Sequence, residues 1–195
     1  MIGDKGFSPK NNMQKGITII ELLVTIIVFA IVITGFLNLF SYAFKAQIKV
    51  LDSQHLLANT AYVSEYISRS LRMARKDIIG NCITAKYNFE NPSGQENAIR
   101  FLNYEEICQE FLLSDNSLQV KKSINDSASS LQEGLPLFPS DINVEDLKFQ
   151  IAGETQDDKL QPKVTFIIKL QTSRNPPQEF NFQTTISQRN LDVFY

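Results

Sequence analysis

The sequence predicts an α+β protein in which a long N-terminal helix packs on an antiparallel β-sheet head. Two observations predict this fold class. An apolar segment, residues 17–40, runs directly into an amphipathic segment, residues 41–80, whose apolar residues recur at helical spacing. From Cys82 onward the apolar residues instead form short segments, several of which alternate as half-buried strands do. The 195 residues allow one ordinary domain with an appendage.

The composition excludes several classes of function. The chain has 19 basic and 21 acidic residues, and this near-balance argues against a nucleic-acid-coating protein. It has one His, His55, and two Cys, which excludes a multi-histidine metal site and a four-thiolate zinc site. It contains no phosphate-binding or nucleophile-elbow motif. We therefore expect no catalytic residue, no cofactor and no metal.

The apolar segment 17–40 is long enough to cross a membrane. Between Ile17 and Leu37 it contains a single charged residue, Glu21. A helix of that length spans ~31 Å, which matches a hydrocarbon core of roughly 30 Å. Three lysines precede the segment, and the polar mass of the chain follows it. This charge distribution predicts an N-terminus inside and a head outside the cytoplasmic membrane.

The helix is expected to continue beyond the membrane. Residues 41–79 contain neither Pro nor Gly, and Gly80-Asn81 is a suitable stop signal, so we expect one helix from Ile17 to about Ile79. Apolar residues at steps of three, four and seven predict a stripe that faces the head: Phe44, Ile48, Leu51, Leu56, Val63, Ile67, Leu71, Ala74 and Ile78.

Residues 81–195 are expected to form the β-rich head. The last two predicted strands, 162–171 and 178–187, flank a turn with two prolines and read as an antiparallel hairpin with one buried face. Residues 122–134 are a polar loop, and 134–140 an irregular turn region. The remaining predicted strands are 82–89, 97–102, 107–113, 117–121 and the alternating segment 147–151.

A short junction, Lys15 to Glu21 with the sequence KGITIIE, joins the polar and apolar segments. Gly16 has no side chain, so a protease can approach its backbone and a helix can begin after it. Glu21 lies one turn inside the apolar helix, where a lone carboxylate is costly and is by default a functional-site candidate. A free or methylated amine on Ile17 would supply a positive partner, and the helix dipole favours a negative charge in the first turns.

This junction resembles the class III signal of type IV pilins and pseudopilins, in which a basic residue and Gly precede an apolar helix with Glu fifth after the Gly. The resemblance implies that residues 1–16 are a leader and that prepilin peptidase cuts between Gly16 and Ile17. The same enzyme would then methylate Ile17. In that family Glu21 would serve subunit assembly. The family most often has Phe where this chain has Ile17, which favours a minor subunit.

The resemblance implies a pilin-like fold and a minor pilin that primes or tips a type IV pilus. Its partners would be other pilins and an assembly platform membrane protein on which an ATPase acts indirectly. Before assembly it would lie in membrane lipid; afterwards it would be extracellular. Two alternatives stay open: a minor pseudopilin of a periplasmic type II secretion system, and a single-pass anchored extracellular binding domain that does not polymerise.

Two further residue groups have alternative interpretations. Cys82 and Cys108 fall in the exported part, so they form either a disulfide or two buried free thiols. A basic patch near the end of the helix consists of Arg69, Arg72, Arg75 and Lys76. We interpret this patch as a solvated helix face rather than a phosphate-binding site, because acidic residues flank it.

Overall fold

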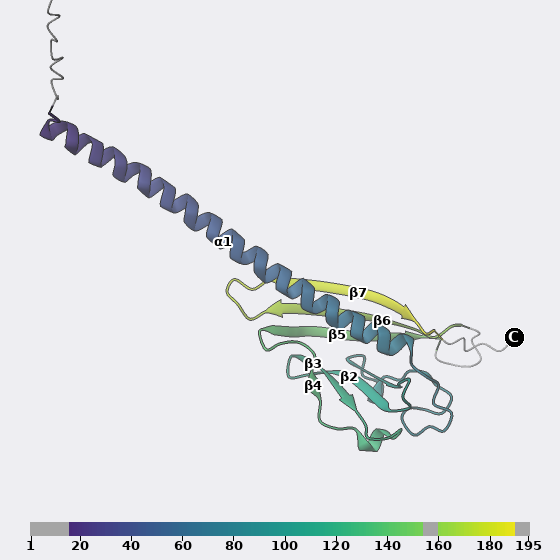
Figure 1. The fold of residues 1–195 in the computed structure, drawn as a ribbon. Coiled ribbons are helices and arrows are strands. Elements are labelled where there is room, and N and C mark those ends of the chain that lie inside the picture. Colours follow the sequence, from purple (N-terminus) through teal and green to yellow (C-terminus); the bar gives the residue numbers. More distant parts are fainter. Residues whose placement is uncertain (1–15, 154–159, 190–195) are drawn as a thin grey trace, which may run out of the picture. The chain divides into compact units, whose positions relative to one another are not determined.

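The computed structural model describes residues 16–153 and 160–189 (Figure 1). It begins with one long helix, α1 (Ile19–Arg72), and continues with strands and two short 3-10 helices, η1 (Pro92–Gly94) and η2 (Ala128–Ser130). The chain divides into two compact units, Met1–Ile48 and Lys49–Tyr195. The second unit contains the C-terminal part of α1 and every strand, and the predicted α+β class is confirmed.

The strands form two antiparallel sheets rather than the single predicted one. The sheets are separate because the outer edge of β5 does not pair with a strand of the first sheet. The Val144 N–H donates to the Asn116 carbonyl and the Phe149 N–H donates to the Glu96 carbonyl, and neither Asn116 nor Glu96 lies in a strand. The first sheet has the order β1 (Ala98–Leu102), β2 (Cys108–Ser114), β3 (Ser117–Lys122) and β4 (Leu135–Pro136), and the second has the order β5 (Ile142–Ala152), β6 (Lys163–Thr172) and β7 (Glu179–Ser187).

The C-terminal hairpin is the best-predicted part of the head. Strands β6 and β7 differ from the predicted ranges by one residue at most, and they pair antiparallel along all of β7. The residues of β6 alternate between buried and half-buried, so one face of the hairpin contributes to the core. Opposite Phe166 and Ile168 lie the inward residues of β7, of which Phe182 contacts the Phe166 ring at 5.6 Å between centroids.

One apolar core joins helix α1 to both sheets. The stripe of α1 in this core comprises Leu56, Val63, Ile67 and Leu71, each at most 3% exposed. Tyr66 flanks the stripe and meets the ring of Phe111 edge-on in β2. Full burial of each such side chain contributes about 1.5–3 kcal/mol, so the head itself stabilises this part of the helix.

The predicted stripe is too long at its N-terminal end. Phe44, Ile48 and Leu51 are 60%, 43% and 54% exposed, and the buried positions of α1 begin at Asp52. The carboxylate of Asp52 pairs with Arg174 in the β6–β7 turn. This charged contact marks the N-terminal limit of the helix's buried face, where the sequence predicts further apolar contacts.

The helix ends at Arg72 and not near Ile79. Beyond it the Arg75 N–H donates to the Leu102 carbonyl, so the chain joins the edge of β1. Gln188 and Arg189, which follow β7, bind carbonyls at this helix end: the Gln188 side chain donates to Ala74 and the Arg189 N–H to Arg72. These contacts satisfy groups that a longer helix would have bonded internally.

The carboxylate of Asp77 organises the turn that follows. Its Oδ1 accepts from the N–H groups of Ile79 and Gly80, and its Oδ2 from those of Cys82 and Ile83, at 2.7–3.1 Å. An aspartate side chain that captures nearby N–H groups competes with regular secondary structure. The predicted strand 82–89 is accordingly wrong: this segment is a series of bends and turns. Ile78, predicted to lie in the stripe, is 77% exposed.

The two cysteines are joined in a disulfide. Cys82 follows the Asp77 turn, Cys108 begins β2, and their Cα atoms are 5.3 Å apart. Of the two alternatives that the sequence left open, the structure therefore contains the disulfide. The bond ties the connection after α1 to the first sheet across 26 positions of sequence, and closing such a loop stabilises a fold by about 3 kcal/mol.

Substitution Asp77→Asn is expected to destabilise the head by roughly 2 kcal/mol near pH 7, because charge-assisted hydrogen bonds are lost. Burial alone would raise the pKa of Asp77, but the N–H donors of Gly80, Cys82, Ile83 and Ile79 outweigh burial and lower it. A lowered folded-state pKa stabilises the fold above the unfolded-state pKa of about 4, and this contribution is lost as the pH falls through the folded-state value.

Denaturant unfolding of the detergent-solubilised chain, followed by near-UV circular dichroism, measures this effect. The difference between wild type and Asp77→Asn should be largest near neutral pH and shrink in acid. Asp146→Asn is the matched control, because Asp146 is exposed and makes only a 3.7 Å surface pair with Lys148. A difference that grows as the pH falls would contradict the role given to Asp77.

Candidate functional site

The N-terminal end of α1 is built around a side-chain cap. Residues 16–18 are not helical, and the Thr18 carbonyl accepts the first helical hydrogen bond, from the Leu22 N–H at 3.1 Å. The Thr18 hydroxyl accepts from the Glu21 N–H at 3.3 Å. Thr18 is therefore the N-cap, and Glu21 occupies the third helical position, the place of the acidic residue in a capping box.

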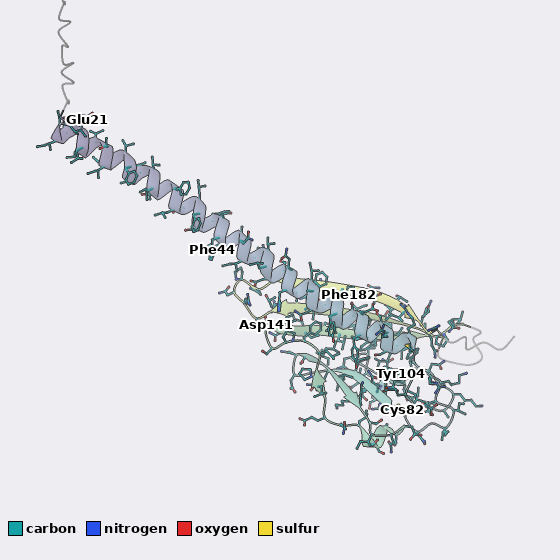
Figure 2. All side chains as sticks on the ribbon, in the orientation of Figure 1. Glu21, Phe44, Cys82, Tyr104, Asp141 and Phe182 are labelled. Atoms are coloured by element: carbon teal, nitrogen blue, oxygen red, sulfur yellow. A yellow bond between two sulfur atoms is a disulfide. The ribbon has the colours of Figure 1, made fainter. Side chains whose placement is uncertain are left out.

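Glu21 is a single acidic group in an apolar exposed surface. Its side chain is exposed and makes no ion pair with any described residue. The apolar side chains along the first unit are exposed as well, with Ile19 86% and Ile20 72% exposed beside it. Figure 2 shows Glu21 at the start of the helix. A carboxylate in such a surface requires a positive partner once water is removed from it.

Gly16 and Ile17 lie in open, non-helical backbone. A methyl group at the Cα of Gly16 would meet no atom within 4 Å, and Ile17 is 75% exposed. The structure therefore places the three predicted residues Gly16, Ile17 and Glu21 within one short exposed segment. The predicted leader otherwise lies outside the described residues.

Among the described residues, one helix is long and apolar enough to cross a membrane, and its most apolar stretch is wholly exposed. Residues 11–37, which include this cap and the beginning of α1, match the prokaryotic N-terminal methylation motif. The chain carries a type IV prepilin-like signal. No curated protein and no solved structure matches the chain.

The methylation motif implies processing by prepilin peptidase and assembly with other pilins. The order of elements, one long apolar N-terminal helix followed by antiparallel sheets, is a pilin-like layout. Type IV pilin-like proteins, which carry this motif, are structural rather than catalytic. The apolar helix is consistent with membrane anchoring.

The head places the other candidate residues in structural contacts. Arg75 of the basic patch pairs with Glu106, and a shallow depression beside Arg69 is lined by Tyr66, Tyr104 and both acidic and basic side chains. His55 Nδ1 lies 3.7 Å from a carboxylate oxygen of Asp141. Within residues 16–153 and 160–189, no three His, Cys, Asp or Glu side chains converge as metal ligands.

Sequence reasoning missed the cap, although a signal for it exists. Thr18 and Glu21 have the Thr-x-x-Glu spacing of a capping box directly before an apolar run. Asp77 was missed as well, and no short motif marks it, because its four donors are recognised only once the turn is folded.

Replacing Thr18 with Ala is expected to loosen the first turn of α1 by about 1 kcal/mol, since the cap hydrogen bond to Glu21 is lost. The amide of Glu21 should then exchange with solvent about fivefold faster in detergent micelles, as measured by NMR. Thr18→Ser keeps the hydroxyl and should exchange at nearly the wild-type rate. Equal exchange in Thr18→Ala and the wild type would show that the hydroxyl does not cap the helix.

Proposed function

We propose that this chain is a minor pilin, a structural subunit that is processed by prepilin peptidase and enters or primes a type IV pilus. The observation that carries the proposal is the lone carboxylate of Glu21 in an exposed apolar helix, inside a matched methylation motif. In this proposal residues 1–16 are the leader and 17–40 the membrane and filament-core segment. The helix continues to Arg72, and residues 81–195 form the exported head.

Cleavage between Gly16 and Ile17 would create the partner that Glu21 lacks among the described residues. The open backbone at Gly16 gives a peptidase access, and the cut leaves a new amine on Ile17 next to the Thr18 cap. Methylation of this amine retains its positive charge. Thr18 already satisfies the Glu21 N–H, so the carboxylate itself is available for an amine on its own chain or on a neighbouring subunit.

Pairing between subunits would determine how neighbouring helices are staggered. A charge in an apolar environment is strongly disfavoured unless an opposite charge lies beside it, so only one relative height of two helices would satisfy Glu21 and the amine of a neighbour. Repeating this contact from subunit to subunit by a rotation that does not close would build a helical filament.

The apolar helix would leave lipid only when sister helices replace the lipid. An assembly platform membrane protein, driven indirectly by an ATPase, would supply the work of extraction. The positively charged leader would keep the N-terminus inside, with the head outside the cytoplasmic membrane. Ile17, at a position that is usually Phe in the family, supports a minor rather than a major subunit.

Glu21→Ala is expected to lower incorporation into sheared filaments at least tenfold while membrane insertion and leader removal persist. The loss follows because the amine of a neighbour no longer finds a carboxylate. Immunoblots of sheared-filament and membrane fractions measure both quantities. Thr25→Ala, one turn further on, is the control, because the Thr25 hydroxyl only bonds the Leu22 carbonyl of its own helix. Normal incorporation of Glu21→Ala would reject the filament role.

A further inference from the structure

Strand β7 (Glu179–Ser187) forms a free edge of the second sheet, whose order is β5–β6–β7. It contains no Pro, no Lys and no Arg, and its one charged residue is Glu179 at its start. Proteins usually protect a long edge strand with lysines, prolines or a bulge, because unpaired backbone groups pair readily with another chain. β7 carries none of these protections.

The pairing with β6 shows which backbone groups of β7 point away from the sheet. The Gln188 N–H donates to the Pro162 carbonyl and the Thr172 N–H donates to the Gln178 carbonyl, so even-numbered residues bond across the ladder. In an antiparallel pair the alternate residues direct their N–H and C=O groups outward. The outward residues are Glu179, Asn181, Gln183, Thr185 and Ser187.

The other edges of the two sheets are either paired or very short within the described part of the chain. β1 exchanges two backbone hydrogen bonds with Glu90, and β5 donates to the carbonyls of Asn116 and Glu96. β4 is only two residues long and ends in Pro136. Among the described strands, β7 is therefore the long one whose outer edge no described segment pairs with.

The core-side face next to this edge is apolar and incompletely covered. Phe180 and Phe182 of β7 are half-buried and pack against the apolar core, and Figure 2 labels Phe182. Leu57 of α1 is 48% exposed. Because Leu57 and Tyr66 are nine positions apart, they lie on opposite flanks of the helix, and Tyr66 packs on the first sheet. Leu57 therefore faces the β7 side, where an added strand would cover it together with the two phenylalanines.

The solvent face next to this edge carries a row of alternating charges. Lys169 Nζ lies 2.5 Å from Glu145 Oε2 and 3.6 Å from Glu179 Oε2. The charges therefore alternate across the sheet, from negative Glu145 in β5 to positive Lys169 in β6 to negative Glu179 at the edge in β7. Opposite charges on neighbouring strands stabilise a sheet, so an added strand should place a Lys or Arg beside Glu179.

We propose that the β7 edge binds an extended segment of a different protein by strand addition. The segment would carry apolar side chains toward α1 and a basic residue beside Glu179, so that its backbone bonds give affinity and its side chains give specificity. A second copy of this chain fits less well, because its own β7 has no basic residue, and a symmetric β7–β7 pair closes into a dimer. This inference goes beyond the filament role and applies equally to a head that never polymerises.

The test uses the full chain in detergent micelles and a labelled synthetic peptide as long as β7, with Val on one face and Thr plus one Lys on the other. Fluorescence anisotropy should show saturable binding. Gln183→Pro removes one outward N–H while leaving the bonds to β6 intact, and Pro is tolerated at such edge positions. It should weaken binding at least tenfold, whereas Gln183→Ala, which keeps the N–H, should bind within about twofold of wild type.

A charge exchange provides a second test that does not depend on the folding of the Pro variant. A peptide with Glu in place of its Lys should bind wild type at least fivefold more weakly, and Glu179→Lys should reverse this preference. Absence of saturable binding, or equal binding by Gln183→Pro when its near-UV circular dichroism is native, would overturn the proposal. Self-association of the free chain that Gln183→Pro abolishes would assign the edge to a second copy and overturn the proposed partner.

Discussion

The first unit of this protein depends on one constraint: an exposed helix of large apolar side chains needs surroundings other than water. Ile19, Ile20 and the apolar residues that follow are more than half exposed along most of this segment, so lipid or other helices must cover them. In the proposed filament Glu21 would be the group that specifies position, because a charge in apolar surroundings is tolerated only beside a cation. The cap on Thr18 fixes the helix start and thereby the height of the carboxylate.

The second unit anchors the other end of the same helix by different means. The stripe from Leu56 to Leu71 packs against both sheets. The edge of β1 and the residues after β7 bind the chain where the helix ends, and the carboxylate of Asp77 organises the turn that follows. The disulfide between Cys82 and Cys108 ties the turn that Asp77 organises to the first sheet. Among the described strands, β7 is the long strand at a sheet edge that pairs with no further segment.

The sequence predicted what periodicity and local chemistry determine. The hairpin of β6 and β7 alternates over enough residues to be recognised, and the apolar segment with Glu21 stands out from its composition. The predictions from sequence were wrong where contacts between distant segments determine the local structure. The predicted helix extends past Arg72 because Ala74 and Ile78 continue the apolar spacing. In the folded chain this segment instead turns into contacts with Leu102 and with the Asp77 carboxylate. Residues 82–89 are apolar like a strand, but donors at Cys82 and Ile83 are already taken by Asp77.

The central claim is that a cut after Gly16 creates the amine that Glu21 requires, and intact-mass and N-terminal analysis of the protein from cells with and without prepilin peptidase tests it most directly. The account predicts a chain that begins at Ile17 and carries one added methyl group in cells that contain the peptidase, and an uncut leader with no methyl group in cells that lack it. A chain that still begins at Met1 when the peptidase is present would contradict the account.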